Sequence, residues 1–389
     1  MLETPKNVEP APEVPSTPSP PKIEAPAPNR STRDQAIDVL RGLCIVSMTT
    51  AHLAAGSWPW QITHAAIYVD GAVGFVFLSG VVLGITQHRT IDRSGLLAGE
   101  RKLLRRIGLI YCAHLALCVL AFSAVAVNPV RAADFPGIES IGGPAATVMA
   151  TLTLQVNPHY IAILSLYVVL LILSVGAIAG LENGRAGLVL AASVGLYTVG
   201  YFWPAVFTFS IQPGVPGAVN WASWQLLFFI ALLVGWNWRT DPVRRMLASR
   251  SLLILATGLV LIAAAAGWVI TRGPRTPWGT VVGRAFTEGT LAPGTILMAL
   301  AAILVGYRIS RVLVRVAQPV VAPLARIGRH SLDCYLILCA GVIIVPGLFS
   351  YDRSGWVAVG VTFDVLVLMW LWSFTRDRMT SRLSPDAPS

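Results

Sequence analysis

Long apolar segments recur along the chain, and each is close to the length that a helix needs to cross a bilayer. The hydrocarbon core is about 30 Å thick, so a spanning helix needs about 20 mostly apolar residues. Apolar runs of this length predict transmembrane helices. We therefore expect an all-α, polytopic membrane protein with about ten transmembrane helices in one bundle, at residues of about 36–55, 65–86, 107–127, 160–180, 187–207, 222–238, 251–270, 291–309, 331–349 and 355–374.

The two ends of the chain lack this pattern. Residues 1–35 hold nine of the 26 prolines together with Glu, Lys, Ser and Thr, a composition that cannot bury enough apolar surface to fold. We expect a disordered, Pro-rich cytoplasmic arm at 1–35, one transmembrane domain at 36–375 and a disordered cytoplasmic tail at 376–389. No small-residue cleavage site follows the first apolar segment, so we expect no cleavable signal peptide.

Composition and charge agree with a membrane protein. The chain is 55% hydrophobic and 12% charged, whereas soluble domains are about 25% charged. With the N-terminus placed in the cytoplasm, the inner segments carry 23 of the 29 Lys and Arg residues. This asymmetry follows the positive-inside rule, so we expect a multi-pass protein of the inner (plasma) membrane with both termini in the cytoplasm. The net charge of +10 then reflects topology and contact with the lipid bilayer, and we expect no nucleic-acid partner.

The cysteines and histidines do not form a metal-binding pattern. All five cysteines lie inside predicted spans, so the outer loops offer no disulfide framework. The chain has no CxxC motif and no Cys/His cluster, and we therefore expect no metal site.

The first apolar segment carries three polar residues on one face of its predicted helix. Arg41 and His52 are eleven positions apart, which is about three full turns, and Asp38 lies three positions before Arg41. Each ion costs about 2.5–3.5 kcal/mol to insert into a bilayer. We therefore expect this face to line a protein interior or a wet cavity, with His52 as a general base for an alcohol and Arg41 as a ligand for a phosphate or carboxylate. The simpler interpretation is that Arg41 snorkels to the inner headgroups and pairs with Asp38.

Three further candidates lie in or near the second and fourth predicted spans, and Asp70 and His159 belong to the outer side. Asp70 either orients a histidine, binds a sugar hydroxyl or pairs with His64. Ser79, in the same predicted span, either permits close helix packing or contacts a substrate. His159 lies just before the fourth span and is either a solvated loop residue or a second outer contact.

The start of the ninth predicted span combines basic residues with a helix-capping residue. Arg329 and His330 form a cytoplasmic basic edge, and Ser331 is a preferred N-cap type. The alternatives are an anion-binding helix start and a plain cap with topology charges. Asp333 and Asp364 lie inside predicted spans, so we expect both to face the bundle interior.

Several motifs in this order resemble those of a known group. Arg41, ten intervening residues and His52 are similar to the Arg-x10-His signature of the acyltransferase 3 superfamily, with Asp38 at the position of the acid before the arginine. Phe75–Gly80 is similar to its Phe-Phe-x-x-Ser-Gly motif, and Gly328–Tyr335 to its Gly-x-x-Ser-x-x-x-Tyr motif. Within the superfamily the chain resembles the OpgC-type branch, on the segments Val69–Gly80, Pro158–Tyr167, Asn220–Phe228 and Ile327–Leu332.

This resemblance implies a membrane-bound O-acyltransferase similar to glucan succinyltransferases. The implied donor is a cytosolic acyl-CoA, succinyl-CoA or acetyl-CoA, used as a substrate with no permanently bound cofactor. The implied acceptor is a hydroxyl of an envelope glycan or glycolipid on the outer side. The resemblance makes His52, Arg41 and Asp38 the catalytic candidates. It also adds Trp224, Gln225 and Tyr335 to the substrate-binding candidates.

The chain departs from the branch at three positions. Val73 and Ala162 stand where the branch has acids, and Ser165 stands where it has a proline. These positions belong to the outer half, so they bear on the acceptor more than on the chemistry. Four basic residues are expected either to contact CoA phosphates or to serve topology alone: Arg105, Arg106, Arg326 and Arg329.

Two other classes of function fit part of the pattern. A proton-coupled secondary transporter of a small solute also uses intramembrane Asp, Arg and His residues, but the chain shows none of the inverted repeats common in that class. A non-catalytic scaffold for acyl-CoA or lipid would bind without turnover. We expect the acyltransferase.

Overall fold

The structure is a computed structural model that describes residues 33–65, 70–128, 137–158, 161–209, 219–272, 286–348 and 350–382. The chain divides into two compact units, Met1–Asp34 and Gln35–Ser389. Within the described ranges the second unit is helical, with one isolated β-bridge between Thr208 and Asn220 and no strand. The predicted all-α class is confirmed.

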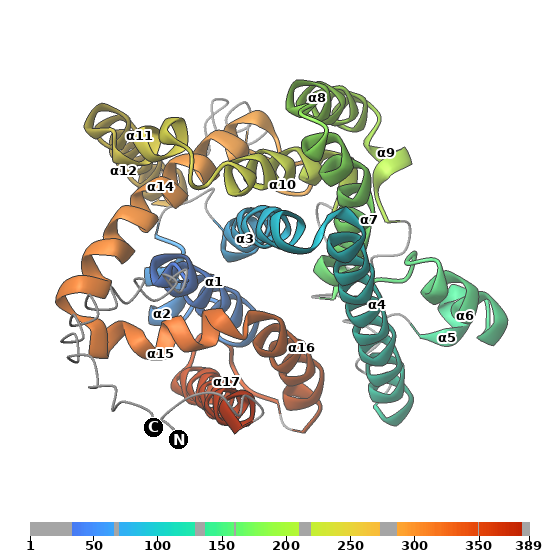
Figure 1. Ribbon diagram of the computed structural model, residues 1–389. Coiled ribbons are helices and arrows are strands. Elements are labelled where there is room, and N and C mark those ends of the chain that lie inside the picture. Colours follow the sequence, from blue (N-terminus) through green and yellow to red (C-terminus); the bar gives the residue numbers. More distant parts are fainter. Residues whose placement is uncertain are drawn as a thin grey trace, which may run out of the picture. The chain divides into compact units, whose positions relative to one another are not determined.

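Helices of very different length follow one another along the second unit (Figure 1). In chain order they are α1 (Gln35–Leu53), α2 (Trp58–Thr63), α3 (Gly71–Ser94), α4 (Leu96–Val127), α5 (Ile138–Ile141), α6 (Pro144–Leu152), α7 (Ala162–Glu182), α8 (Ala186–Phe202), α9 (Pro204–Phe207), α10 (Trp221–Trp236), α11 (Asp241–Ala248), α12 (Arg250–Arg272), α14 (Pro293–Val316), α15 (Gln318–Arg329), α16 (Ser331–Leu348) and α17 (Trp356–Arg382).

Helix α1 is surrounded by other helices. It contacts α2, α3, α14, α15, α16 and α17, and Figure 1 shows it enclosed by them. This arrangement follows from the sequence of α1, which carries Asp38, Arg41 and His52 on one face. Exposing that face to lipid would cost a large insertion free energy. The helix with the strongest candidate chemistry is therefore also one of the most buried spans.

Glycines allow α1 and α3 to approach their partners closely. A methyl group added at Gly328 in α15 would overlap the Asp38 carbonyl oxygen in α1. A methyl group added at Gly235 in α10 would overlap the Val81 carbonyl oxygen in α3. Small residues at such crossings let helix backbones touch inside a membrane, where van der Waals packing replaces the hydrophobic effect.

The number of membrane spans differs from the prediction. Each of the ten predicted segments contains a helix, but among the described residues seven helices are long and apolar enough to cross a bilayer, or eight if the bent pair α11 and α12 forms one span. The helices α8 and α10 have 17 and 16 residues, which corresponds to a rise of about 24–26 Å against a hydrocarbon core of about 30 Å. The count of about ten is therefore not confirmed, because apolar composition identified the helices without fixing their length.

Candidate functional site

The part of the site nearer the N-terminal end of α1, called the inner part here, is built around Arg41, which lies inside the protein. Arg41 and Asp38 retain 6% and 2% of their exposed surface. The guanidinium carbon of Arg41 lies 5.8 Å from the centre of the Phe75 ring. Snorkelling would carry the guanidinium to the headgroups, so this burial rules it out. The aromatic face instead offers the cation a favourable contact within the bundle.

Aromatic side chains from three helices surround that contact. The Phe75 ring of α3 meets Tyr167 of α7 edge to face, with centroids 5.9 Å apart, and stacks on Tyr335 of α16 at 6.0 Å. The Tyr167 hydroxyl donates a hydrogen bond to the Phe75 carbonyl at 3.1 Å. Tyr335, a candidate from its motif, therefore lies in the same cluster as Arg41.

Two more polar groups reach this cluster. The Ser79 hydroxyl is buried next to Tyr167, without the alignment of a hydrogen bond. Arg106 of α4 lies within electrostatic range of Tyr167 and is half-buried, whereas Arg105 is exposed. Two guanidinium groups, one hydroxyl and two phenols thus converge in the inner half, a set suited to an anionic group such as a phosphate or carboxylate.

The outer part of the site lies where α1 ends and α3 begins. His52, in the last turn of α1, is half-buried. Asp70, the residue before α3, lies within electrostatic range of His52 and has its Oδ1 3.8 Å from Nε2 of His64. Asp70 is also within electrostatic range of the side chain of Glu288, in the loop before α14. The predicted pairing of Asp70 with His64 is present, and Glu288 joins it.

The neighbours of His64 hold its ring in place. The ring stacks on Trp60 with centroids 5.3 Å apart, and its Nδ1 lies 3.0 Å from the Thr63 hydroxyl and 3.2 Å from the Trp60 carbonyl. Thr63 is in turn hydrogen-bonded to Thr50 of α1 at 2.9 Å. Because Nδ1 faces these oxygens, Nε2 is the nitrogen that faces Asp70.

The pKa values of the Asp70 and Glu288 carboxyl groups shift in opposite directions. Burial alone would raise the pKa of Asp70, but the closeness of His64 and Glu288 and the positive charge of the histidines lower it. Burial and then the neighbouring Asp70 carboxylate raise the pKa of Glu288 to about 9. Glu288 as a residue keeps exposed surface, so the closeness of Asp70 is the firmer cause of that rise.

Cys44 lies between the inner and outer groups along α1. Its thiol is within electrostatic range of both Arg41 and Asp70, and its Sγ would meet a methyl group added at Gly74 of α3. Asp38, Arg41 and His52 remain on one continuous helix, as the spacing predicted. The structure therefore places the cationic inner cluster and the His/carboxyl outer cluster along the same α1–α3 contact.

Trp224 and Gln225 are buried in α10 and have internal partners. The Trp224 Nε1 donates to the carbonyl of Gly289 at 3.2 Å, next to Glu288. The Gln225 amide nitrogen donates to the carbonyls of Ser193 and Ala222 at 2.7 and 3.0 Å. Its oxygen accepts from the Ser193 hydroxyl at 2.7 Å. Gln225 thus ties α10 to α8, and Trp224 holds the loop that carries Glu288.

The basic edge at the start of α16 is paired with α17. Asp377 accepts from Nε of Arg326 at 3.3 Å and from Arg329 at 3.4 Å, and its Oδ1 lies 2.8 Å from Nε2 of His330. The Ser331 hydroxyl is buried and has no hydrogen-bond partner among the described residues, so it does not cap α16. This cluster is built as an intramolecular ion-pair network.

Three further predictions concern other positions. Asp333 is half-buried and pairs with Arg376 at 3.1 Å, whereas Asp364 is exposed on α17, so the prediction that both face the bundle interior is wrong for Asp364. The expectation failed because a residue's face depends on which neighbours pack on its helix. His159 lies outside the described residues.

Sequence reasoning missed a buried histidine. His114 of α4 has its Nδ1 3.3 Å from the Ser165 hydroxyl and its Nε2 3.5 Å from the Cys118 sulfur. The Ser165 hydroxyl donates to the side-chain oxygen of Asn157. His114 and Ser165 have no exposed surface, so this network joins α4 to α7 and does not meet a substrate.

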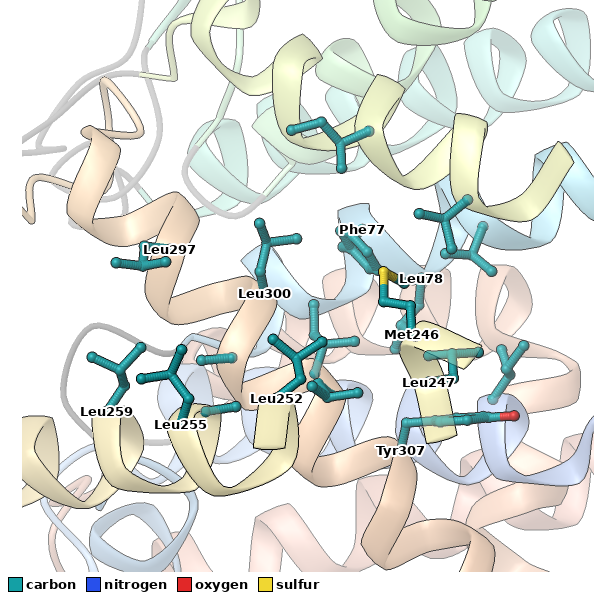
Figure 2. A pocket seen from close by; sticks show the side chains of 18 of the residues that line it. Phe77, Leu78, Met246, Leu247, Leu252, Leu255, Leu259, Leu297, Leu300 and Tyr307 are labelled. Carbon is teal, nitrogen blue, oxygen red and sulfur yellow. The ribbon is translucent and has the colours of Figure 1, made fainter. Parts of the chain in front are cut away.

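An apolar pocket lies on another side of α3. It has a volume of about 340 Å³ and is walled by α3, α10, α11, α12 and α14, together with Ile37 of α1 (Figure 2). Figure 2 shows Phe77, Leu78 and Leu300 around it, with Tyr307 at one end. No ionisable group other than Tyr307 lines it, so it offers nothing to hold a phosphate or move a proton.

Comparison with known proteins identifies the family. The sequence profile of the OpgC protein family matches residues 33–381, nearly all of the membrane domain. No curated protein and no solved structure matches the chain. The matched range contains Arg41, His52, Asp70 and Glu288 together. The chain belongs to the OpgC protein family.

Proposed function

We propose that this protein is an integral-membrane O-acyltransferase that moves an acyl group, expected to be succinyl, from cytosolic acyl-CoA to a hydroxyl of an extracytoplasmic glycan. Membership of the OpgC family supports a glucan-modifying transferase. One observation carries the finer proposal. A single buried helix, α1, presents Arg41 to a cationic and aromatic cluster and, three turns further on, presents His52 to a histidine and carboxyl cluster.

The proposed step needs no group beyond the two substrates and these side chains. His52 takes the proton from an acceptor hydroxyl, whose oxygen attacks the thioester carbonyl. The C–S bond breaks, and the CoA thiolate leaves and takes up the proton that His52 received, directly or through water, which returns His52 to its neutral form. The products are the glycan ester and free CoA, so the proton balance closes.

Arg41 is proposed to hold the donor. Its planar guanidinium suits a CoA phosphate or the free carboxylate of a succinyl group, because two N–H groups bond two oxygens at once. Arg106, half-buried beside Tyr167, provides a second positive charge on the same path. Asp38, buried three positions before Arg41, is proposed to restrict the arginine side chain.

The proposed direction follows from the charge asymmetry of the loops. With both termini in the cytoplasm, α1 begins at the inner side, so Arg41 meets a cytosolic donor and His52 meets an outer acceptor. The carboxyl and imidazole groups around His52 supply hydrogen-bonding partners of the type that sugar hydroxyls use.

The test is acyl transfer by His52→Ala. Membrane vesicles that hold the full chain receive succinyl-CoA or acetyl-CoA, and envelope glycan is analysed by mass spectrometry for the added acyl group. Loss of general-base catalysis should lower the rate by about 10²–10⁴-fold. His88→Ala is the matched control, because His88 stacks on Trp236 at 4.6 Å and contacts Asp92. Wild-type transfer by His52→Ala, at equal protein level, would remove His52 as the base, and solute uptake without transfer would favour a transporter.

A further inference from the structure

The apolar pocket on the other side of α3 opens to the outside of the bundle. Leu255 of α12 and Leu297 of α14 line it and keep 61% and 53% of their surface exposed. Phe77 and Leu78 of α3 also line it and are buried, so they form its deep wall. The outer surface of a membrane protein meets lipid, and an apolar cavity excludes water. A pocket with this opening therefore receives hydrocarbon.

The pocket has the length of one bilayer leaflet. Figure 2 shows Leu297 and Leu259 at one end and Tyr307 and Leu247 at the other. Leu297 and Tyr307 are ten positions apart on α14, which corresponds to a rise of about 15 Å. The hydrocarbon core is about 30 Å thick, so one leaflet contributes about 15 Å. This length suits a single acyl chain of a membrane lipid that lies along α14.

The Tyr307 end carries the residue types that are typical of a membrane–water interface. Tyr307 packs edge to face on Trp238, with ring centroids 5.7 Å apart, and both residue types concentrate at the level of the lipid headgroups. Helix α11 lines this end with Leu247, whereas Arg244 and Arg245 of the same helix are exposed. A short helix with apolar and basic faces is suited to lie in the interface plane. The Tyr307 end is therefore the headgroup end of the pocket.

Two more arginines stand beside this end, although the walls of the pocket hold no charged group. The guanidinium carbon of Arg311 lies 5.9 Å from the centre of the Tyr307 ring. Arg308 follows Tyr307 in α14 and donates from Nη2 to the Ala248 carbonyl at 2.8 Å. Its Nε is buried and has no hydrogen-bond partner among the described residues. An unpaired buried N–H is costly, and a phosphate oxygen at this position would satisfy it.

We propose that the pocket binds one acyl chain of an anionic phospholipid, whose phosphate group is held by Arg308 and Arg311 at the Tyr307 end. The apolar walls select the chain, and the adjacent guanidinium groups select the negative charge. The proposed topology places this end at the cytoplasmic leaflet, whose surface is negatively charged. Ile37 of α1 lies in the wall, one turn before Arg41, so the bound chain would pack against the helix that carries the proposed catalytic residues. The lipid site does not require acyl transfer.

Native mass spectrometry of the full-length protein tests the site for the acyl chain. The protein in detergent is titrated with palmitoyl-oleoyl-phosphatidylglycerol, and we expect one tightly bound lipid. Leu300 lines the pocket, so Leu300→Trp should fill it and weaken binding by about tenfold or more, and Ala256→Leu fills the same space with a smaller side chain should Leu300→Trp not fold. Leu261→Trp is the matched control, because Leu261 of α12 is exposed and does not line the pocket. Wild-type binding by folded Leu300→Trp or Ala256→Leu would overturn the proposal.

The choice of headgroup is tested on the arginines. Wild-type protein should bind phosphatidylglycerol about tenfold more tightly than phosphatidylcholine with the same chains. Arg308→Gln and Arg311→Gln should each remove most of that preference, and glutamine at position 308 keeps an N–H donor for the Ala248 carbonyl. Arg185→Gln is the control, because Arg185 is an exposed arginine that precedes α8. Equal binding of the two lipids by wild-type protein, or an unchanged preference in both pocket variants, would contradict the proposal.

A competition experiment separates the lipid from the other molecule that joins a long acyl chain to phosphate groups. Palmitoyl-CoA is added to the protein loaded with phosphatidylglycerol. We expect the lipid to stay bound at equimolar palmitoyl-CoA. Displacement of the lipid at that ratio would show that the pocket serves a long-chain acyl-CoA, and the lipid site would be rejected.

Discussion

The Tyr167 hydroxyl donates a hydrogen bond to the Phe75 carbonyl at 3.1 Å and so joins the second turn of α7 to the first turns of α3. The guanidinium of Arg41 lies over the ring of the same Phe75. The position of Arg41 therefore depends on a contact between two helices that are distant in sequence. Four predictions follow from contacts of this kind.

Tyr167→Phe should weaken the contact that holds Phe75, and with it Arg41, in position. The substitution removes one buried hydroxyl and leaves the ring in place, so the free energy of unfolding should fall by about 0.5–1.5 kcal/mol. We expect a lower melting temperature in detergent and a higher KM for the acyl donor. Tyr201→Phe is the control, because the Tyr201 ring stacks on Tyr197 away from Arg41. An unchanged melting temperature together with an unchanged KM would contradict the support role.

Arg41→Lys should fail to replace arginine although it keeps the charge. A lysine ammonium cannot stack as a plane on Phe75 or form two parallel bonds with a phosphate or carboxylate. We expect KM for the donor to rise by about tenfold or more, since one charge-assisted bond contributes about 1.5–3 kcal/mol. Arg311→Lys is matched, because its guanidinium lies 5.9 Å from the Tyr307 ring outside the site. A similar KM in both variants would show that charge alone suffices.

Gly328→Ala should separate α15 from α1. The added methyl group would overlap the Asp38 carbonyl group and the Gly42 backbone nitrogen of α1. These backbone atoms can move aside only if the two helices separate. We expect a loss of about 1–3 kcal/mol of stability, or loss of folded protein, seen as reduced membrane levels and an earlier thermal transition. Gly347→Ala, in α16, has open space around the new methyl group and should be neutral or slightly stabilising. A stable Gly328→Ala protein would mean that the two helices can move apart.

Gln225→Leu should affect stability more than substrate binding. All the hydrogen bonds of the Gln225 side chain go to Ser193 and Ala222, and the substitution leaves the Ser193 groups without that partner. The expected cost is about 1–3 kcal/mol in the free energy of unfolding, with KM for donor and acceptor near wild type. A raised acceptor KM with unchanged stability would instead support the substrate-binding role that the OpgC resemblance implied.

Local spacing made much of the inner site predictable. A helix of fixed pitch places Arg41 and His52 on one face whatever packs around it, and the cost of burying ions requires protein on that face. Ser79 and Tyr335 were found through their motifs. Tyr167 belonged to a matching segment, yet nothing in its local pattern indicated that its hydroxyl would meet Phe75.

The outer site was less predictable because its members come from separate segments. Asp70 and His64 are close in sequence, but Glu288 reaches them from the loop before α14. A glutamate in an outer loop is ordinarily solvated, so its sequence environment gives no sign that it lies near Asp70. The signal is the contact itself, and the anchored Gly289 carbonyl is what makes the contact possible.

By itself the sequence determined the helical class, the apolar segments, the face of α1 that carries Asp38, Arg41 and His52, and the family. These depend on composition and on helix pitch, which act over a few turns. Only the tertiary structure decided which helices are long enough to span, that Arg41 lies buried over Phe75, and that Glu288 meets Asp70. Those outcomes depend on how distant helices pack, because close backbone contacts and anchored loops are set by the partner as much as by the residue itself.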